Sequence, residues 1–288
     1  MVGILLAGGL GTRLGPITKV VSKQLLPIYD KPMIFYPISL LMAAGITEII
    51  VITTPQDQDS FRKLLGDGHQ WGIAIHYVEQ PHPNGLPEAF LLSAELIAGR
   101  SCTLMLGDNI IYGSQIGKKI ANNLNGSGAS IYGYLVNDIS AFGTVILDPQ
   151  GKAIEIKEKP ISGGKGLAIP GIYHFDKSVV EKSRQLEKSA RGELEIVDLL
   201  NLYLSDNNLE VTIIDRGIAW LDTGTIEDLA MASELVRVVQ SRQGMLVGSP
   251  EEVAFRKNLI NSVALEELAS SYGDSLYGRA LREILLEK

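Results

Sequence analysis

The sequence is poor in cysteine, and this scarcity excludes a whole class of stabilising bond. Cys102 is the only cysteine among 288 residues, so no disulfide can form within the chain and nothing indicates an oxidising compartment. The residues that follow it, 103–106, form a short apolar run that predicts a buried strand. We therefore expect Cys102 to be a small residue of the hydrophobic core.

An excess of positive charge and long apolar runs are also missing. The formal net charge is -7 at pH 7, which argues against a general affinity for nucleic acid, because a phosphate backbone requires a basic surface. No apolar stretch approaches the roughly 18 residues of a membrane span, and the run at 2–6 is too short for a signal peptide. We expect a cytoplasmic protein without nucleic-acid or membrane partners.

What is present is an alternation of short apolar runs with amphipathic stretches, which is typical of βαβ units. In the first half, strands are predicted at 2–6, 48–53, 73–78 and 102–106, and helices at 33–43, 57–65 and 88–98. This rhythm predicts an α/β fold with a Rossmann-like, mixed and mostly parallel sheet flanked by helices. Gly45 and Gly66 stand where helix ends need a residue of positive φ.

The pattern changes after Asp108. A helix is predicted at 114–124 and strands at 129–136, 144–147, 153–157 and 171–175, with a turn at 148–151. We expect these strands to extend the same sheet with mixed pairings. From Thr225 onward the pattern is helical, with breaks at Gly244, Gly248 and Pro250 and a further helix start at Asn261 or Ser262. The expected organisation is an α/β domain at 1–224 followed by a C-terminal helical region at 225–288.

The turn after the first strand is the most informative segment. It reads Gly8, Gly9, Leu10, Gly11, Thr12, Arg13, and three glycines in four residues allow backbone N–H groups to approach an anion closely. The turn therefore fits a phosphate group. A tight connection between a strand and a helix is the alternative interpretation.

Two common nucleotide-binding motifs do not fit this turn. A dinucleotide fingerprint requires a glycine three residues after Gly11, where Leu14 stands, and an acidic residue further on, whereas Lys23 follows. A P-loop requires Gly-Lys-Ser or Gly-Lys-Thr, and the sequence contains neither. These differences disfavour an NAD-dependent oxidoreductase and exclude a P-loop enzyme.

Longer strings that include the turn resemble the sugar-phosphate nucleotidyltransferases. The matching segments are 5–13, 22–33, 54–57, 64–68, 79–81, 107–109, 158–160, 191–195 and 219–225. The likeness is collinear over essentially the full chain, which makes it far more specific than any single motif. Within the family it is closest to the members that transfer thymidylyl groups.

The resemblance implies that a sugar 1-phosphate oxygen attacks the α-phosphorus of a nucleoside triphosphate, with dTTP and a hexose 1-phosphate as substrates. The nucleophile needs no strong base, because a phosphate monoester has its second pKa near ~6. The obstacle is to bring two anions together and to stabilise the leaving pyrophosphate, which requires fixed cations and a metal ion. The implied cofactor is Mg²⁺, which suits one or two carboxylates plus substrate phosphates.

The resemblance also assigns residues. The catalytic residues would be Arg13, Lys23, Asp108, Lys159 and Asp222, with Asp108 and Asp222 as metal ligands. The nucleotide would bind at Leu6, Gly8, Gly9, Gly11, Thr12, Arg13, Lys23, Gln24, Gln80, Gly85, Leu86 and Asp108. The sugar phosphate would bind at Asn109, Gly143, Glu158, Lys159, Tyr173 and Arg191. These assignments divide the α/β domain into a nucleotide-binding part at 1–110 and a sugar-binding part at 111–224.

Each of these residues also has a plainer interpretation when it is considered alone. A single Lys or Arg is more often a solvated surface charge. Asp108 lies in Gly-Asp-Asn, which is also good turn chemistry. Tyr173 would more often belong to the core. The combination, in the family's order, is what favours a catalytic site.

The chain departs from the family pattern near both substrates. Gly15 stands where His or Tyr is usual, and Pro87 and Glu88 replace Ala and Gln near the nucleotide. Near the sugar, Phe142 replaces Tyr, and 164–170 replaces a segment that ends in Asn, Tyr or Phe, Ala, Val, Thr. The identity of the sugar is therefore less determined than the type of reaction.

The family often has a second, regulatory nucleotide site between subunits. Its matching residues here are Tyr112, Gly113, Arg216, Gly217, Glu252 and Arg256, whereas Ile116 and Gly117 replace an aromatic residue and a His. Feedback inhibition is only a weak expectation. The helical tail and the resemblance favour a homotetramer. Two other functions stay open: a uridylyltransferase that uses UTP, and a catalytically silent regulatory homologue that binds nucleotide.

Overall fold

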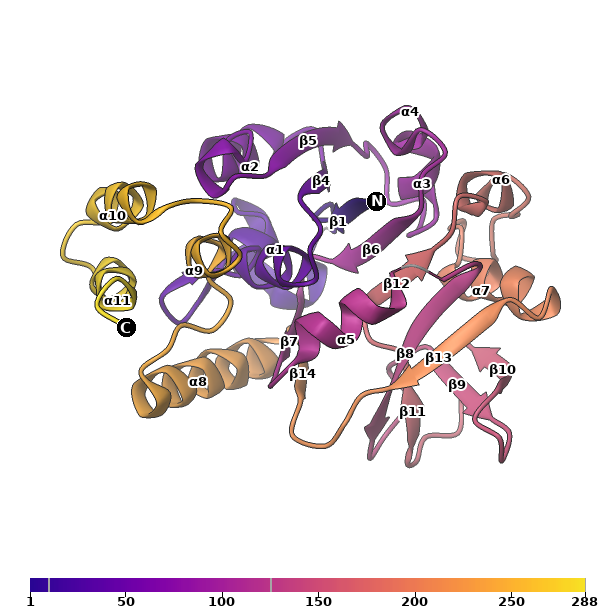
Figure 1. The fold of residues 1–288 in the computed structure, drawn as a ribbon. Coiled ribbons are helices and arrows are strands. Elements are labelled where there is room, and N and C mark those ends of the chain that lie inside the picture. The colour runs from indigo at the N-terminus through magenta and orange to yellow at the C-terminus, as the bar shows by residue number, and fades with distance from the viewer. Residues whose placement is uncertain (10, 125, 288) are drawn as a thin grey trace.

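The computed structural model describes residues 1–9, 11–124 and 126–287, and it contains a mixed sheet with helices on both faces (Figure 1). The strands of this sheet are β1 (Val2–Leu6), β4 (Glu48–Thr53), β5 (Ala74–Glu79), β6 (Cys102–Leu106), β8 (Ala129–Val136), β9 (Thr144–Leu147), β10 (Ala153–Lys157), β11 (Gly166–Ala168), β12 (Ile172–Phe175) and β13 (Leu209–Ile213). Their order is β10-β9-β11-β8-β12-β6-β1-β4-β5, and β13 pairs with β8.

The sheet changes its pairing where the sequence pattern changes. Strands β6, β1, β4 and β5 run parallel to one another. Strand β12 joins them antiparallel to β6, and the pairings among β8 to β12 are antiparallel, whereas β13 lies parallel to β8. The α/β class and the mixed pairing of the second half are therefore confirmed.

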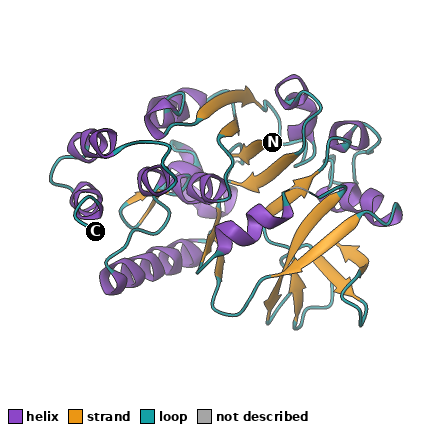
Figure 2. Cartoon of the chain, viewed as in Figure 1, coloured by secondary structure: helices purple, strands orange, loops and turns teal. Residues whose placement is uncertain are grey.

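Helices and two small strand pairs surround the sheet (Figure 2). The α-helices are α1 (Phe35–Ala43), α2 (Gln58–Leu65), α3 (Glu88–Leu92), α4 (Ala94–Ile97), α5 (Ile116–Asn123), α6 (Val179–Ser183), α7 (Ile196–Ser205), α8 (Ile226–Gln243), α9 (Pro250–Arg256), α10 (Ser262–Ser271) and α11 (Leu276–Ile284). The 3-10 helices are η1 (Thr12–Lys19), η2 (Lys23–Leu25) and η3 (His69–Trp71). The small pairs are β2 (Pro27–Ile28) with β3 (Lys31–Pro32), and β7 (Asn109–Tyr112) with β14 (Ala219–Asp222).

The core lies on both faces of the parallel strands, and this explains their continuous apolar runs. Successive side chains of a strand point to opposite faces. On β1, Leu5 packs into the hydrophobic cluster of α1 and α2, whereas Ile4 packs into the cluster of α3 and α7. Cys102 belongs to this second cluster, and burial raises the pKa of its thiol. The expectation that it is a core residue is confirmed.

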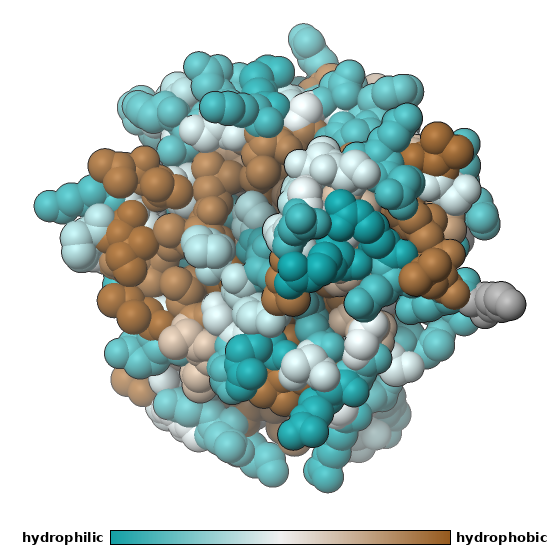
Figure 3. Space-filling view, turned by 90° about the vertical axis from the view of Figure 1, so that its left-hand side faces the viewer, coloured by the Kyte–Doolittle hydropathy of each residue, from teal (hydrophilic) through white to brown (hydrophobic). Residues whose placement is uncertain are grey.

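The C-terminal region is helical, as expected from Thr225 onward. Thr225 caps α8 through a capping box: its hydroxyl accepts from the N–H of Asp228, whose carboxylate accepts from the N–H of Thr225. Gly244 ends α8 at φ 64, and the side chain of Asn261 caps α10. Figure 3 shows hydrophobic areas among hydrophilic ones on the side of the molecule that bears these helices. In the described part of the chain, no helix is both long and apolar enough for a membrane span.

Some elements differ from the prediction. The helix expected at 88–98 is divided into α3 and α4 at Ser93, which is fully buried. The pattern gave no prediction for α6, α7 and β13. These elements pack against neighbours that are distant in sequence: β13 pairs with β8 in register from Leu209 opposite Ala129. Such contacts leave little local signal.

A buried histidine on β12 gives the fold a pH-dependent weakness. His174 is 1% exposed; its Nδ1 lies 3.3 Å from the Thr103 hydroxyl, and its Nε2 has no hydrogen-bond partner among the described residues. Burial lowers the pKa of His174 from 6.5 to about 4, although the negative charge of Asp176 opposes this shift. Between these two pH values the unfolded chain binds a proton that the folded chain does not, so stability falls as the pH falls.

We expect this residue to cost the protein about 3 kcal/mol of unfolding free energy when the pH is lowered from 7 to 4. His174→Gln, which cannot be protonated there, should show a correspondingly smaller loss between these pH values in urea unfolding experiments. The exposed His69 provides the control: His69→Gln should keep the wild-type dependence. An identical pH dependence in wild type and His174→Gln would show that His174 is not the sensitive group.

Candidate active site

A pocket with a volume of about 370 Å³ lies at the carboxyl ends of the parallel strands. Leu6 ends β1, Leu106 ends β6 and Gln80 directly follows β5, and all three line it. Parallel strands place their carboxyl ends at one edge of the sheet, where open α/β sheets bind ligands. Most of the predicted site residues line this pocket: Leu6, Gly8, Gly9, Arg13, Gln24, Gln80, Gly85, Leu86, Asp108, Asn109, Gly143, Glu158, Lys159, Tyr173, Arg191 and Asp222.

Three predicted residues, Gly11, Thr12 and Lys23, do not line the pocket. Leu10, which belongs to the same turn, lies outside the described residues. Gly11 has φ 58, in the left-handed region that favours glycine, and a Cβ atom there would come within 2.9 Å of the Thr18 side chain. The turn thus needs glycine at this position for its own conformation, while Gly8 and Gly9 face the cavity.

Lys23 does not line the pocket, but it forms an ion pair with Asp108, which does. Its Nζ lies 2.7 Å from Oδ2 of Asp108, and its side chain is only 7% exposed. Asp108 itself lines the pocket and also accepts a hydrogen bond from the Asn109 side chain at 3.0 Å. Because a buried cation is expensive without a partner, this ion pair fixes the Asp108 carboxylate at the wall of the cavity.

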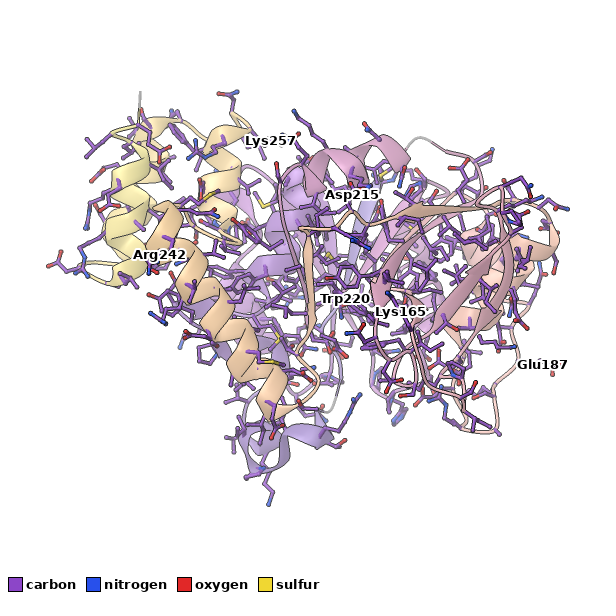
Figure 4. The ribbon with its side chains drawn as sticks, turned by 90° about the horizontal axis from the view of Figure 1, so that it is seen from below. Lys165, Glu187, Asp215, Trp220, Arg242 and Lys257 are labelled. Carbon is purple, nitrogen blue, oxygen red and sulfur yellow. The ribbon has the colours of Figure 1, made fainter. Side chains whose placement is uncertain are left out.

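The antiparallel pair β7 and β14 brings the two predicted metal ligands together. Asp222 lies opposite Asn109 in this pair, next to Asp108. The Thr223 hydroxyl donates to the backbone oxygen of Asp108 at 2.8 Å, and Trp220 Nε1 donates to the side-chain oxygen of Asn109 at 2.7 Å. Figure 4 shows Trp220 on β14 near the middle of the molecule, between the C-terminal helices and the second half of the sheet. These contacts hold Asp108 and Asp222, which are far apart in sequence, in one part of the pocket lining.

The electrostatics of this wall favour a bound cation. Burial raises the pKa of Asp222, and the neighbouring Asp108 carboxylate adds to this effect, while Lys23 and Arg13 oppose it. A Cβ atom on Gly224 would lie 3.3 Å from Asp222 Oδ2 and 3.4 Å from an Arg13 guanidinium nitrogen, so glycine leaves room for both groups. Two adjacent carboxylates with a shared opening are a suitable donor set for a hard divalent cation.

The balance of charge among the residues that line the pocket also favours a bound cation. The described residues that line it include five carboxylates, Asp108, Glu158, Glu193, Glu195 and Asp222, against three basic side chains, Arg13, Lys159 and Arg191. Two phosphorylated substrates would add further negative charge. Among the described residues no group of three or more His, Cys, Asp or Glu forms a ready-made metal site. A metal here would need ligands from substrate or water, as Mg²⁺ normally has.

The other two cations of the pocket, Lys159 and Arg191, form a second charged group. Lys159 Nζ lies 3.2 Å from Glu158, and Arg191 pairs with Glu195 at 2.8 Å and more distantly with Glu158 at 3.7 Å. Lys159 has φ 40, which a non-glycine residue rarely adopts. Strained backbone of this kind concentrates at binding and catalytic sites. Both cations are about half exposed, so an anionic ligand can reach them.

Tyr173 is both a core residue and a pocket residue. Its side chain is 5% exposed and packs in the cluster that contains Ile4 and Phe175, yet it lines the cavity. Burial raises its pKa, and the carboxylates of Glu158 and Asp108 raise it further. The hydroxyl therefore stays protonated and keeps its hydrogen for donation.

Gly85 lies where two segments of the pocket lining meet. It forms an isolated parallel bridge with Leu194, and the N–H of Leu194 donates to the backbone oxygen of Asn84 at 2.7 Å. Gly85 has φ 103, and a Cβ atom would lie 2.0 Å from the backbone oxygen of Leu194. No other residue fits this position without movement of the backbone.

Sequence reasoning missed part of the apolar and aromatic lining. Trp220 packs against Phe142, with ring centroids 4.9 Å apart, and both line the pocket. Further lining residues that were not assigned are Pro83, Leu106, Ala141, Ile169, Gly171, Glu193, Leu194, Glu195, Ile196, Val197 and Leu200. The apolar character of most of them does not separate them from core residues. Glu193, Leu194 and Glu195 lie within a segment that matched the family, and this was the available signal.

Comparisons with known proteins agree with this geometry. The family model described as nucleotidyl transferase matches residues 2–238. Glucose-1-phosphate thymidylyltransferase of Mycolicibacterium smegmatis is 47% identical over 285 residues, and that of Neisseria meningitidis is 48% identical over 288 residues. Each alignment covers 99% of both chains.

A solved structure gives the same result at the level of the fold. A crystal structure from Bacillus anthracis in complex with a sucrose, described as a glucose-1-phosphate thymidylyltransferase, superposes with a TM-score of 0.75 and 35% identity, covering 82% of this chain and 96% of that chain. Family match, full-length identity and fold all agree. The chain belongs to the nucleotidyl transferase family and, within it, to the glucose-1-phosphate thymidylyltransferases.

Proposed function

We propose that the protein transfers a thymidylyl group from dTTP to α-D-glucose 1-phosphate, or a closely related hexose 1-phosphate, and releases pyrophosphate. The observation that carries this proposal is that one pocket contains two groups of charged side chains: Arg13 with Asp108 and Asp222, and Lys159 and Arg191 around Glu158. Two separate anion sites in one cavity suit a reaction between two phosphorylated substrates. Relatives with the corresponding name span 99% of the chain.

The residues of the chain bind and orient both substrates. The glycine turn and Arg13 would hold the triphosphate. Lys23 would hold Asp108 in place through the ion pair between its Nζ and Asp108 Oδ2, at 2.7 Å. Lys159 and Arg191 would exchange their present partners, Glu158 and Glu195, for the phosphate of the sugar. The sugar phosphate oxygen is then positioned for in-line attack on the α-phosphorus. Catalysis comes mainly from this positioning and from stabilisation of the pyrophosphate charge.

Magnesium is the cofactor that the donor set fits. Asp108 and Asp222 would hold it together with substrate oxygens, and bound Mg²⁺ would neutralise charge on the reacting phosphates. The cavity supports this assignment because its carboxylates outnumber its basic side chains.

The remaining assignments follow the resemblance to the family, and all of these residues line the pocket. The base would lie against Gln24, Gln80, Gly85 and Leu86, and Glu158 would accept hydrogen bonds from sugar hydroxyls. Residues 1–110 would thus serve the nucleotide and 111–224 the sugar.

A matrix of nucleoside triphosphates against sugar 1-phosphates tests the function. Pyrophosphate release and product mass should be greatest for dTTP with glucose 1-phosphate in the presence of Mg²⁺. Equal use of UTP would favour a uridylyltransferase, because the pocket must then disregard one methyl group and one 2′-hydroxyl. Binding without pyrophosphate release for any pair would identify a silent homologue. The homotetramer stays a prediction, which light scattering tests.

A further inference from the structure

Glu88 departs from the Gln that is usual in the family, and the structure gives it defined partners. Its carboxylate accepts a hydrogen bond from Gln80 Nε2 at 2.8 Å and one from Asn84 Nδ2 at 2.8 Å. Glu88 begins α3 and is not among the residues that line the pocket. Gln80 does line it and is only 7% exposed. Glu88 therefore contacts the pocket through another side chain.

The partners of Gln80 determine which way its amide points. Nε2 of Gln80 also donates to the backbone oxygen of Gly85 at 3.3 Å. A carboxylate and a carbonyl accept hydrogen bonds and cannot donate them, so the amide atom that faces both must be the nitrogen. The amide oxygen is consequently fixed on the other side of the group.

That oxygen faces the glycine turn. A Cβ atom on Gly8 would lie 3.5 Å from Gln80 Oε1, and Gly8 lines the same pocket. No side chain or backbone N–H of the described residues donates to Oε1 within hydrogen-bond distance. Gln80 thus offers the pocket an acceptor that has no donor among the described residues, and a ligand in the pocket can donate to it.

We propose that Glu88 is a positioning residue for base selection: it fixes the Gln80 amide so that its oxygen, and not its nitrogen, meets the base. This inference rests on the proposed function, in which the nucleotide base lies against Gln80. Thymine and uracil carry an N–H at ring position 3, which donates to such an acceptor. Cytosine carries a bare nitrogen there, which would place two acceptors against each other and leave both unsatisfied.

A Gln at position 88 would not impose this orientation. Its amide can present either an N–H or an oxygen to Gln80, so the Gln80 amide could turn over and offer its nitrogen to the pocket. Only the longer contact to the Gly85 oxygen, at 3.3 Å, would then oppose the turn. The carboxylate of Glu88 removes this freedom.

Glu88→Gln tests the proposal, since it removes one charge and keeps the size of the side chain. The ratio of kcat/KM for dTTP to that for dCTP should fall about tenfold, because one well-oriented hydrogen bond is worth about this factor. The KM for glucose 1-phosphate should stay within about twofold. Glu88→Ala, which removes the partner entirely, should change the ratio in the same direction and serves if the first variant does not fold.

Two matched variants separate base selection from other roles. Glu95→Gln removes an exposed carboxylate from the neighbouring α4 and should leave all constants unchanged. Asn84→Ala removes the other side-chain bond to Glu88 and keeps both the bond from Gln80 to Glu88 at 2.8 Å and the backbone bond to Leu194, so it should leave the dTTP to dCTP ratio unchanged.

An unchanged ratio in both Glu88 variants, with the wild type active on dTTP, would overturn the inference while the proposed function stands. A parallel rise in the KM of both substrates without a change in the ratio would also overturn it, because it would assign Glu88 to support of the loop. A wild type that makes no dTDP-sugar would instead refute the proposed function itself.

Discussion

Asp222→Ala is expected to lower kcat by at least about a thousandfold, which corresponds to about 4 kcal/mol of transition-state stabilisation. Asp222 and Asp108 are the two carboxylates that the β7 and β14 pair places side by side in the pocket wall. Removal of one would leave a single carboxylate for the proposed Mg²⁺, which would otherwise have only substrate oxygens and water as ligands. Pyrophosphate release, measured over a range of Mg²⁺ concentrations, gives both kcat and the apparent affinity for the metal.

The controls for this experiment come from the same chain. Asp215→Ala removes an exposed carboxylate that pairs with Lys119 at the surface, so it should retain turnover. Asp222→Asn keeps the shape of the side chain and should be nearly as inactive as Asp222→Ala, because the amide carries no charge. Circular dichroism establishes that the variants are folded. Full activity of a folded Asp222→Ala at low Mg²⁺ would remove Asp222 from the set of metal ligands.

Much of the fold was predictable because its signals are local. The strands predicted at 2–6, 48–53 and 102–106 have those bounds, since strands buried on both faces appear as uninterrupted apolar runs. Gly66 ends α2 at φ 58 as predicted, because few other residues tolerate this conformation. Elements whose conformation depends on a few adjacent residues can therefore be predicted from the sequence.

The contacts that complete the site were not predictable in this way. The pairing of β7 with β14 joins Asn109 to Asp222 over more than a hundred residues, and neither short strand has a clear periodic pattern. The hydrogen bond that Gln80 donates to Glu88 requires the start of α3 to lie beside the end of β5. The resemblance supplied the list of residues, but the partners that orient them, such as Trp220 on Asn109 at 2.7 Å, required the structure.

Arg13→Ala is expected to lower kcat by about a hundredfold while the KM for glucose 1-phosphate stays within about threefold. The guanidinium lies near Asp222 beside Gly224, whereas Lys159 and Arg191 are paired with Glu158 and Glu195. In the proposed arrangement Arg13 would contact the triphosphate and stabilise charge that develops on the leaving pyrophosphate, so its loss should act on the transition state more than on binding of the other substrate. Initial rates with each substrate varied in turn separate the two effects.

The comparison with Lys19 makes the test specific to position instead of charge. Lys19 is exposed, is separated from Arg13 by the kink at Gly15 that interrupts the segment 12–19, and does not line the pocket. Lys19→Ala therefore removes an equal charge from a nearby position and should leave kcat within about twofold, because Lys19 does not line the pocket and solvent and salt screen its charge from the substrates. If Arg13→Ala raised the KM for glucose 1-phosphate and left kcat unchanged, Arg13 would belong to the sugar phosphate site. The pocket would then hold its two anions in the opposite order, with the triphosphate at Lys159 and Arg191.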